Sequence, residues 1–264
     1  QSSSIAGLDA LALVRFGLRA ADDPRILNTL KIVDDTLKIQ TPFGPVWRRY
    51  EDDHYGEHAD GRVYDGGGIG RAWPLLTGER AHYELDAGQT ECATALAKVL
   101  EAIAGENGLL PEQVWDSTDV PARELFIGRP AGSAMPLVWA HAEYLKLCRS
   151  LDEGNIFDQP PQTVRRYLVD RVSSGHASWR FNHQIRTLPR GGLLRVETMA
   201  SGLVHWTTDG WRNVHRTPTV DTTVGIHVAD LETESLPEGD QVELTFFWSE
   251  ARRWEGTNFT IAII

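Results

Sequence analysis

Residues 109–116 read Leu-Leu-Pro-Glu-Gln-Val-Trp-Asp, and they follow a helical pattern that stops at Gly105 and Gly108. The segment is therefore a loop that ends a helix, and it carries an acid, an amide and a large aromatic ring. An aromatic ring offers a flat apolar face to a pyranose, an amide can hydrogen-bond its hydroxyls, and a carboxylic acid can move a proton. These residue types indicate a sugar site around Glu112. The alternative is a capping loop that buries Trp115 in the core.

Helical spacing of apolar residues occurs on both sides of this loop. A first helix is expected at residues 8–15. A second is expected after Asp23-Pro24, where an acid can cap a helix and proline fits its first turn. Further helical patterns cover residues 77–86, 90–104 and 133–151. Residues 40–72 are rich in glycine and aromatic residues and lack periodicity, and a loop of that length is usually functional.

The pattern of the sequence changes after residue 151. Residues 152–161 are a turn-rich linker that ends in a double proline. Beyond it, short runs rich in Thr, Val, Trp and Phe alternate with turns, at residues 163–172, 176–187, 192–199, 203–208, 222–228, 241–249 and 257–264. We therefore expect a helical domain over 1–151 and an all-β sandwich over 162–264.

Composition excludes several classes of protein. The 264 residues are 41% hydrophobic and 24% charged, as in ordinary globular domains. The formal net charge of −11 argues against a nucleic-acid partner, which needs clustered Lys and Arg. No apolar run approaches the roughly 18 residues of a membrane helix, so no membrane span is expected. Cys92 and Cys148 are expected to be buried thiols, with a single bridge as the alternative.

A set of segments around and beyond the 109–116 loop carries a resemblance to a known family. Its members are Trp47–Tyr50, Tyr55–Glu57, Asp65–Arg71, Trp73–Glu79, Leu110–Asp116, Val138–Tyr144, Phe157–Gln162 and Leu203–Trp211. In order and spacing, these segments resemble the catalytic domain and C-terminal part of bacterial glucoamylases and glucodextranases, glycoside hydrolase family 15. The resemblance implies an (α/α)6 toroid as the catalytic fold.

The number of helices implies that this chain builds only part of the toroid. The family's toroid needs about a dozen helices, whereas about five fit before residue 151. The chain therefore resembles the second half of the toroid plus a C-terminal β domain. Half a toroid would expose a broad apolar face, at a cost of about 25 cal/mol per Å². We expect a companion N-terminal polypeptide to complete it, with a free-standing five-helix bundle as the alternative.

Under the resemblance, Glu112 matches the general base of the family. In an inverting glycosidase one carboxyl group protonates the leaving oxygen while the other deprotonates a water. The family's general acid has no counterpart before residue 40, so we expect it on the companion chain. The alternative is a local pair of Glu112 with one of the acids Glu51, Asp52, Asp53 and Glu57. Such clustered acids are commonly solvated or bound to neighbouring arginines, here Arg48 and Arg49.

The resemblance also implies a set of substrate-binding residues. Arg49, followed by Tyr50, matches the family's substrate-binding arginine, and a guanidinium has five donors suited to paired hydroxyls. An ion pair of Arg49 with Asp52 or Asp53 is the alternative. The other residues implied to lie around the sugar are Trp47, Tyr55, Glu57, Arg71, Trp73, Gln113, Trp115 and Trp139. Core packing is the alternative for each tryptophan.

The expected activity is exo-hydrolysis of an α-glucan, or of malto- or isomalto-oligosaccharides, with release of β-D-glucose from the non-reducing end. Two alternatives are a glucosyltransferase of the dextran dextrinase kind on the same scaffold and a non-catalytic carbohydrate-binding subunit. The protein is expected to be secreted or periplasmic, although no signal peptide is visible after Gln1.

No cofactor is expected to be required. His54 and His58 have a metal-ligand spacing but no third ligand in the sequence around them, so no metal site is predicted. Calcium, which the family sometimes carries, is possible, but no acidic loop specifies it. The run Gly66–Gly70 lacks a preceding strand and a Gly-Lys-Ser/Thr signature, so a phosphate-binding loop is not expected.

Aromatic residues of the β domain are candidates for a second sugar-binding surface. One group is Trp206, Asp209 and Trp211, and the other is Trp248 and Trp254. The alternative for these side chains is core packing and docking against the helical domain.

Overall fold

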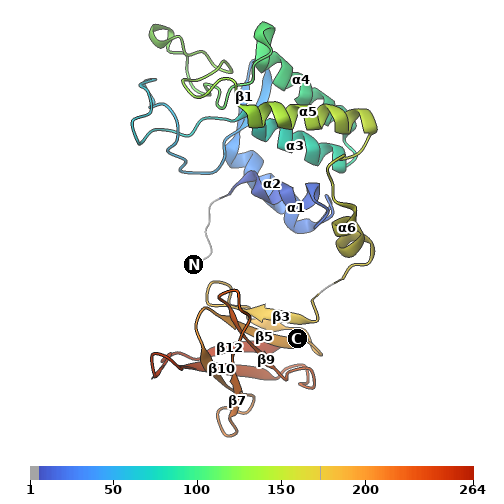
Figure 1. Cartoon of the computed structure of the whole chain (residues 1–264), viewed down its shortest axis with the longest axis vertical. Helices are drawn as coiled ribbons and strands as arrows, with labels where there is room; N and C mark the ends of the chain where they lie inside the picture. Colours follow the sequence, from blue (N-terminus) through green and yellow to red (C-terminus); the bar gives the residue numbers. More distant parts are fainter. Residues whose placement is uncertain (1–5, 173) are drawn as a thin grey trace. The chain divides into compact units, whose positions relative to one another are not determined.

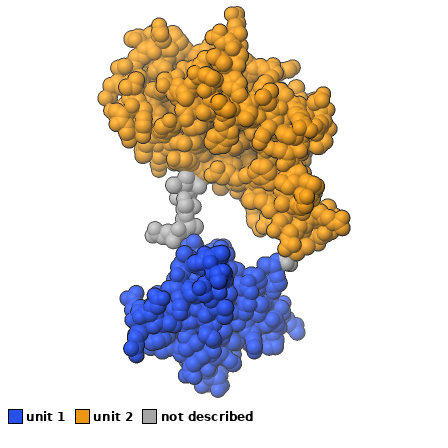
Figure 2. All heavy atoms as spheres, in the orientation of Figure 1, with its two compact units in different colours: residues 1–3, 173–264 blue, residues 4–172 orange. Residues whose placement is uncertain are grey.

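The computed structural model describes residues 6–172 and 174–264. These residues form two compact units, a helical one that continues to residue 172 and a β-rich one that begins at residue 174 (Figure 2). Each unit has a hydrophobic core of its own. The described residues therefore confirm that the chain runs from helices to β-sheets. No described helix combines the length and the hydrophobicity that crossing a membrane requires.

Four helices of more than ten residues dominate the described part of the helical unit (Figure 1). They are α2 (Pro24–Leu37), α3 (Pro74–Asp86), α4 (Thr90–Ala104) and α5 (Val138–Glu153). The shorter helical segments are η1 (Leu8–Leu11), α1 (Ala12–Arg15), η2 (Gly105–Asn107), η3 (Pro121–Arg123), α6 (Pro161–Val164) and the π-type segment η4 (Arg165–Val169). Strands β1 (Lys38–Thr41) and β2 (Gly44–Trp47) pair as an antiparallel hairpin.

The helices predicted from periodicity are confirmed, except that residues 133–137 are not helical and α5 begins at Val138. Helix α2 begins as its sequence indicates. The carboxylate of Asp23 accepts a hydrogen bond of 2.9 Å from the N–H of Arg25, and Pro24 occupies the first turn. Residues 38–47 form a hairpin, although the sequence from residue 40 onward was expected to be a loop. Strands of four residues are too short to show a clear alternation, so the pattern did not reveal them.

The strand predicted at residues 163–172 is wrong. Residues 161–169 are helical, and the compact helical unit continues to residue 172, past the linker expected at 152–161. The physical reason is visible in the sequence. Pro161 provides a favourable first helical position, and Val164, Tyr167 and Leu168 have helical spacing.

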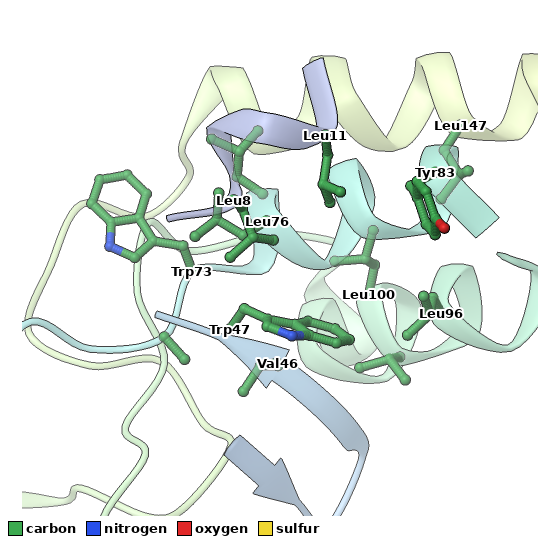
Figure 3. Close-up of a cluster of buried hydrophobic side chains, with 14 of the residues drawn as sticks. Leu8, Leu11, Val46, Trp47, Trp73, Leu76, Tyr83, Leu96, Leu100 and Leu147 are labelled. Atoms are coloured by element: carbon green, nitrogen blue, oxygen red, sulfur yellow. The ribbon is translucent and has the colours of Figure 1, made fainter. Parts of the chain in front are cut away.

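The core of the helical unit lies between α3, α4 and α5. The indole of Trp47, from β2, packs in it with Leu76 and Leu100, and Figure 3 shows Trp73 at its edge. Gly78 of α3 allows α5 to approach closely, because a Cβ at this position would lie 2.7 Å from Cγ of Glu143. The helix interface thus depends on a position without a side chain.

The described part of the second unit contains two β-sheets. One has the strand order β4-β12-β10-β6-β7, with β11 paired to β10, and the other has the order β3-β5-β9-β8. The pairs β4–β12 and β3–β5 are parallel, and the others are antiparallel. The strands are β3 (His176–Trp179), β4 (Thr187–Leu188), β5 (Leu193–Thr198), β6 (Gly202–Thr207), β7 (His215–Pro218), β8 (Val220–Asp221), β9 (His227–Leu231), β10 (Gln241–Trp248), β11 (Arg253–Trp254) and β12 (Phe259–Ile263).

Both sheets contribute to the core of the β-rich unit. Alternate residues of β10, Val242, Leu244 and Phe246, are fully buried in it, as are Leu194 and Val196 of β5. Strands predicted at 192–199, 203–208, 241–249 and 257–264 are confirmed. Strand β7 was missed, because its four residues are mostly exposed and show no alternation of apolar and polar types.

The hypothesis of a sugar-binding surface at Trp206 and Asp209 is wrong, and so is the hypothesis that the thiol of Cys92 is buried. Trp206 is 5% exposed within the core of the β-rich unit, so it offers no ring face to a sugar. The carboxylate of Asp209 accepts hydrogen bonds from the N–H groups of Arg212 and Asn213, and it therefore stabilises its own turn. The thiol of Cys92 is exposed rather than buried, and neither Cys92 nor Cys148 forms a disulfide.

Candidate active site

The loop that carries Glu112 is fixed by a short ladder of hydrogen bonds. The N–H of Glu112 donates to the carbonyl of Ala134 at 2.8 Å, and the N–H of Leu137 donates to the carbonyl of Leu110 at 2.9 Å. The N–H of Leu110 donates to Nε2 of His141, from α5, also at 2.9 Å. Loop 110–114 is therefore held against the chain that enters α5. The loop that precedes α3 and the loop that follows α4 extend from the same end of these two helices (Figure 1).

Glu112 is a half-buried residue, and its carboxylate is contacted by two donors. The hydroxyl of Tyr55 lies 3.5 Å from Oε2 of Glu112, and the N–H of Ala134 lies 3.4 Å from the same oxygen. The negative charge of Glu112, together with partial burial, raises the pKa of the Tyr55 phenol. The phenol therefore stays protonated and can donate to the carboxylate. A carboxylate held in this way can accept a proton from a water molecule.

Arg49 lies beside this carboxylate, on a cluster of aromatic rings. Its guanidinium carbon is 4.7 Å from the ring centre of Trp73, 5.2 Å from that of Tyr55 and 5.3 Å from that of Tyr50. Nε and Nη2 donate to the two carboxylate oxygens of Asp53, each at 2.8 Å. The ion pair foreseen as the alternative is therefore present. Nη1 has no partner among the described residues, so it can hydrogen-bond a ligand.

Two residues predicted to bind substrate lie beneath the site instead. Arg71 is 1% exposed and Trp115 is fully buried, and the Arg71 guanidinium lies 4.0 Å from the ring centre of Trp115. Arg71 also donates to the carbonyls of Glu57 and His58, at 2.8 and 2.9 Å. The prediction that these two side chains contact a sugar is therefore wrong for this structure, because the fold buries them. They support the loops from below.

Gln113 and Glu57 also occupy buried positions, 1% and 5% exposed. The side-chain amide of Gln113 donates to the carbonyl of Tyr55 at 2.9 Å, and its backbone N–H donates to Oγ of Ser133. Gln113 therefore fixes Tyr55 next to Glu112 rather than presenting its amide to solvent. Oε1 of Gln113 and Oε2 of Glu57 are buried without a hydrogen-bond partner among the described residues. Because both side chains are buried, the structure does not place them where they could contact a sugar.

The remaining tryptophans divide between core and surface. Trp47 is 2% exposed, and its indole donates to Asp34 at 2.9 Å, so the prediction of substrate contact is wrong for Trp47. Trp139 is 59% exposed on the first turn of α5. Trp73 is also buried, at 5% exposed, and it lies under Arg49 and 6.3 Å from the ring of Tyr55. The structure thus brings Trp73, and not Trp47, to Glu112 and its neighbours.

Several neighbours of Glu112 were not found by sequence reasoning. The ring of Tyr64 contacts that of Tyr55 edge to face at 5.2 Å, and Ser133, Ala134 and His141 hold the Glu112 loop. Tyr64 lies in the glycine-rich loop already singled out, so its aromatic ring was an available signal. Ser133, Ala134 and His141 contact the Glu112 loop because a distant segment folds against it, and no local sequence pattern predicts that contact.

The glycine-rich run is needed for a close backbone contact. A Cβ on Gly68 would collide with the carbonyl oxygen of Gly56, so residues 53–57 and 68–71 can lie side by side only without that side chain. The N–H of Ile69 donates to the carbonyl of Glu57 at 3.2 Å across this contact. Of the side chains on these two segments, that of Tyr55 is 39% exposed whereas that of Arg71 is buried.

The acids of residues 51–53 face a different hollow. A polar hollow of about 380 Å³ is lined by Tyr50, Glu51, Asp52, Asp53 and other residues, but Glu112 is not among them. Asp53 is paired with Arg49, and Glu51 and Asp52 line a hollow that does not include Glu112. The geometry therefore does not support the local carboxylate pair.

The two histidines of the glycine-rich loop have separate partners. Nε2 of His58 lies 3.0 Å from Asp65, and Nδ1 of His54 lies 3.3 Å from the carbonyl of Gly68. Within residues 6–172 and 174–264, no three His, Cys, Asp or Glu side chains are grouped so that they could hold a metal ion.

Comparison with known proteins adds to this geometry. A family model described as glycosyl hydrolases family 15 matches residues 2–149. The chain belongs to this family. The match to family 15 covers the residues of the Glu112 site and ends before the β-rich unit. It confirms the resemblance drawn from the segments between Trp47 and Tyr144.

Individual relatives of this family 15 chain are similar over limited stretches. A glucoamylase of Clostridium sp. strain G0005 is 48% identical over 159 residues, which are 60% of this chain and 21% of the relative. The crystal structure of a bacterial glucoamylase complexed with acarbose has 48% identity and a TM-score of 0.57, and the match covers 62% of this chain and 23% of that one. A cycloisomaltooligosaccharide glucanotransferase of Niallia circulans is 33% identical over 98 residues, 32% of this chain and 10% of the relative. The chain thus spans about a fifth of the glucoamylase that it matches.

Proposed function

We propose that this chain is the part of an inverting α-glucan exo-hydrolase that carries the general base. The observation that supports this proposal is the position of Glu112. This residue is half-buried, and its carboxylate is contacted by the hydroxyl of Tyr55 and lies beside Arg49 on a cluster of aromatic rings. Family 15 membership and the similarity to a glucoamylase point to glycoside hydrolysis as the reaction.

In the proposed reaction, Glu112 removes a proton from a water molecule as that water attacks the anomeric carbon. Tyr55 donates to the carboxylate and keeps it in position. Nη1 of Arg49 bonds to sugar hydroxyls, while the exposed rings of Tyr50 and Tyr55 contact the apolar face of the sugar. Attack from the face opposite the leaving group inverts the anomeric centre and releases β-D-glucose.

The general acid and the rest of an (α/α)6 toroid are proposed to come from a companion N-terminal polypeptide. The helical unit exposes large apolar side chains on two of its helices. Val138, Trp139 and Leu145 of α5 are 79%, 59% and 66% exposed, and Leu27 and Ile32 of α2 are about half exposed. Val138 and Leu145 are seven residues apart and therefore share one face of α5. An apolar helix face of this kind is suited to packing against further helices.

The substitution Glu112→Gln tests the proposed base, and it is made in the protein isolated with whatever polypeptide copurifies with it. We expect kcat for glucose release from malto- and isomalto-oligosaccharides to fall by about 10²–10⁴-fold, while circular dichroism stays unchanged. Glu106→Gln, an exposed glutamate of η2, is the matched control and is expected to retain full activity. Near-normal turnover by folded Glu112→Gln protein would exclude Glu112 as the base.

Four further measurements separate the remaining parts of the proposal. Proton NMR of the first product distinguishes inversion from retention, and oligosaccharides longer than the substrate would indicate glucosyl transfer instead of hydrolysis. Intact-mass analysis of the native material should reveal a second polypeptide. Substantial turnover by this chain alone would contradict the assignment of the acid to a companion.

A further inference from the structure

The β-rich unit contains a hollow that the proposed hydrolytic site does not use. It has a volume of about 700 Å³, within the range of ligand pockets. Its walls include Phe181, Met199, Trp248, Glu250, Arg253 and Glu255. All lie between residues 174 and 264, so the hollow is built by this unit alone.

Trp248, at the end of β10, is held rigidly at this hollow by three contacts. Its ring is stacked on that of Phe246, with an interplanar angle of 7° and a centroid distance of 5.3 Å. Across the strand pair it lies over Gly202, where a Cβ would come within 3.3 Å of the indole. Its Nε1 donates to Glu255 at 2.8 Å. The half-exposed indole therefore loses little conformational entropy when a ligand stacks on it.

A second aromatic ring and a polar rim complete the hollow. The ring of Phe181 is 38% exposed and lies 5.9 Å from that of Trp248. Glu250 and Arg253 are exposed, and neither side chain has a hydrogen bond or ion pair within the described residues 174–264. The hollow thus combines two apolar ring surfaces with acceptors and donors that are free to bond a ligand.

The charges of the hollow indicate which chemical class it binds. Two carboxylates and one guanidinium line it, in a chain with a formal net charge of −11, so phosphorylated and other anionic ligands are disfavoured. A neutral polyhydroxylated ring matches both the aromatic surfaces and the mixed charges of the hollow. Its C–H face can stack on an indole, and its hydroxyls can bond to carboxylates and a guanidinium.

We propose that this hollow is a carbohydrate-binding site, separate from the Glu112 site, in which a glucose unit of an α-glucan stacks on Trp248. Phe181 contacts the adjoining part of the sugar chain, and Glu250, Arg253 and Glu255 bond its hydroxyls. The choice of an α-glucan among neutral carbohydrates rests on the proposed function. The existence of the site rests on the β-rich unit alone.

Affinity electrophoresis of the complete chain in native gels that contain soluble starch or dextran tests this proposal. Retardation of the unsubstituted chain by at least one of these polymers is expected. Trp248→Ala should weaken the apparent affinity about tenfold or more, because it removes the stacked ring. Trp254→Ala is the matched control, since Trp254 is 53% exposed in the neighbouring strand β11 but does not line the hollow.

A second variant guards against misfolding of the first. Glu250→Ala combined with Arg253→Ala changes only exposed side chains, and this double variant should also weaken retardation while leaving the circular dichroism spectrum unchanged. Absence of retardation by both polymers, or equal loss in Trp248→Ala and Trp254→Ala, would overturn the proposal. Near-normal turnover by folded Glu112→Gln protein, together with retardation that depends on Trp248, would refute the proposed function and leave this site in place.

Discussion

Asp116 and Arg71 form an ion pair of 3.0 Å in which both side chains are almost completely excluded from solvent. The other carboxylate oxygen of Asp116 accepts hydrogen bonds from Nε of Arg48 at 2.7 Å and from the N–H of Ala72 at 3.1 Å. One carboxylate therefore joins the Glu112 loop to two segments that lie more than forty residues earlier in the chain. Buried ion pairs to Asp116 therefore support the site, whereas the aromatic rings surround Arg49.

Asp116→Asn should destabilise the helical unit by about 3–5 kcal/mol, because it leaves the buried guanidinium of Arg71 without its counter-charge. Urea denaturation followed by circular dichroism measures the change. The matched control is Asp60→Asn, which removes an ion pair with Arg62 in which both side chains are more than half exposed. That control should change stability by less than about 1 kcal/mol. Equal effects of the two substitutions would show that the Asp116 pair is not a buried one in solution.

The imidazole of His141 fixes the Glu112 loop through the N–H of Leu110. His141→Ala would leave this N–H, in a residue that is 2% exposed, without an acceptor, at a cost of about 1–3 kcal/mol. We expect kcat to fall about tenfold with little change in KM, because the base moves while the ring cluster stays in place. His141→Gln, whose side-chain oxygen can accept the same bond, should restore most of kcat. Identical kcat values for the alanine and glutamine variants would contradict this role.

The sequence and the structure agree most closely where local pattern decides the outcome. Periodicity and capping located the long helices, and the quoted loop segments located Glu112, Arg49 and Tyr55 in one place. The pattern could not show that Arg71 and Trp115 are buried while Tyr50 and Tyr55 are exposed. Burial is decided by segments that meet in space, and motif spacing carries no information about which side of a loop faces solvent.

The two arginines of residues 48–49 show the same limit. The resemblance implies that Arg49 binds substrate, and it gives Arg48 no role beyond a possible partner for the nearby acids. The structure pairs Arg48 with the buried carboxylate of Asp116 and sets Arg49 over Trp73. Asp116 and Trp73 are distant in sequence from both arginines, so only the folded chain shows why one arginine supports the site and the other can bind substrate.

Arg49→Lys should therefore weaken binding of an oligosaccharide by about 10–100-fold, since a lysine cannot both pair bidentately with Asp53 and keep a donor for the ligand. Isothermal titration calorimetry with acarbose, which a related glucoamylase binds, measures this change. Arg62→Lys, on the exposed pair with Asp60, is the control and should leave the affinity unchanged. A lysine variant with unaltered affinity would remove Arg49 from the binding site.

Glu79 should make the stability of the helical unit depend on pH. Burial, followed by the negative charge of Glu143, raises the pKa of Glu79 from 4.5 to about 7. The folded chain therefore holds a proton that the unfolded chain releases between about pH 4.5 and pH 7. The free energy of unfolding consequently falls as pH rises through this window, and the loss is complete above pH 7.

Glu79→Gln isolates this effect, because the amide stays neutral at every pH. At pH 4 the variant should be about as stable as the unsubstituted chain, since the glutamate is then protonated in both states. At pH 8 it should be more stable by about 3–4 kcal/mol, the free energy equivalent of a pKa displaced from 4.5 to about 7. Urea denaturation of both proteins at intervals between pH 4 and pH 8 gives the difference at each pH. The exposed Glu106→Gln serves as the control. A Glu79→Gln difference that stays constant with pH would show that the pKa of Glu79 is the same in the folded and unfolded chains, because the two stability curves diverge only where the two states bind different numbers of protons.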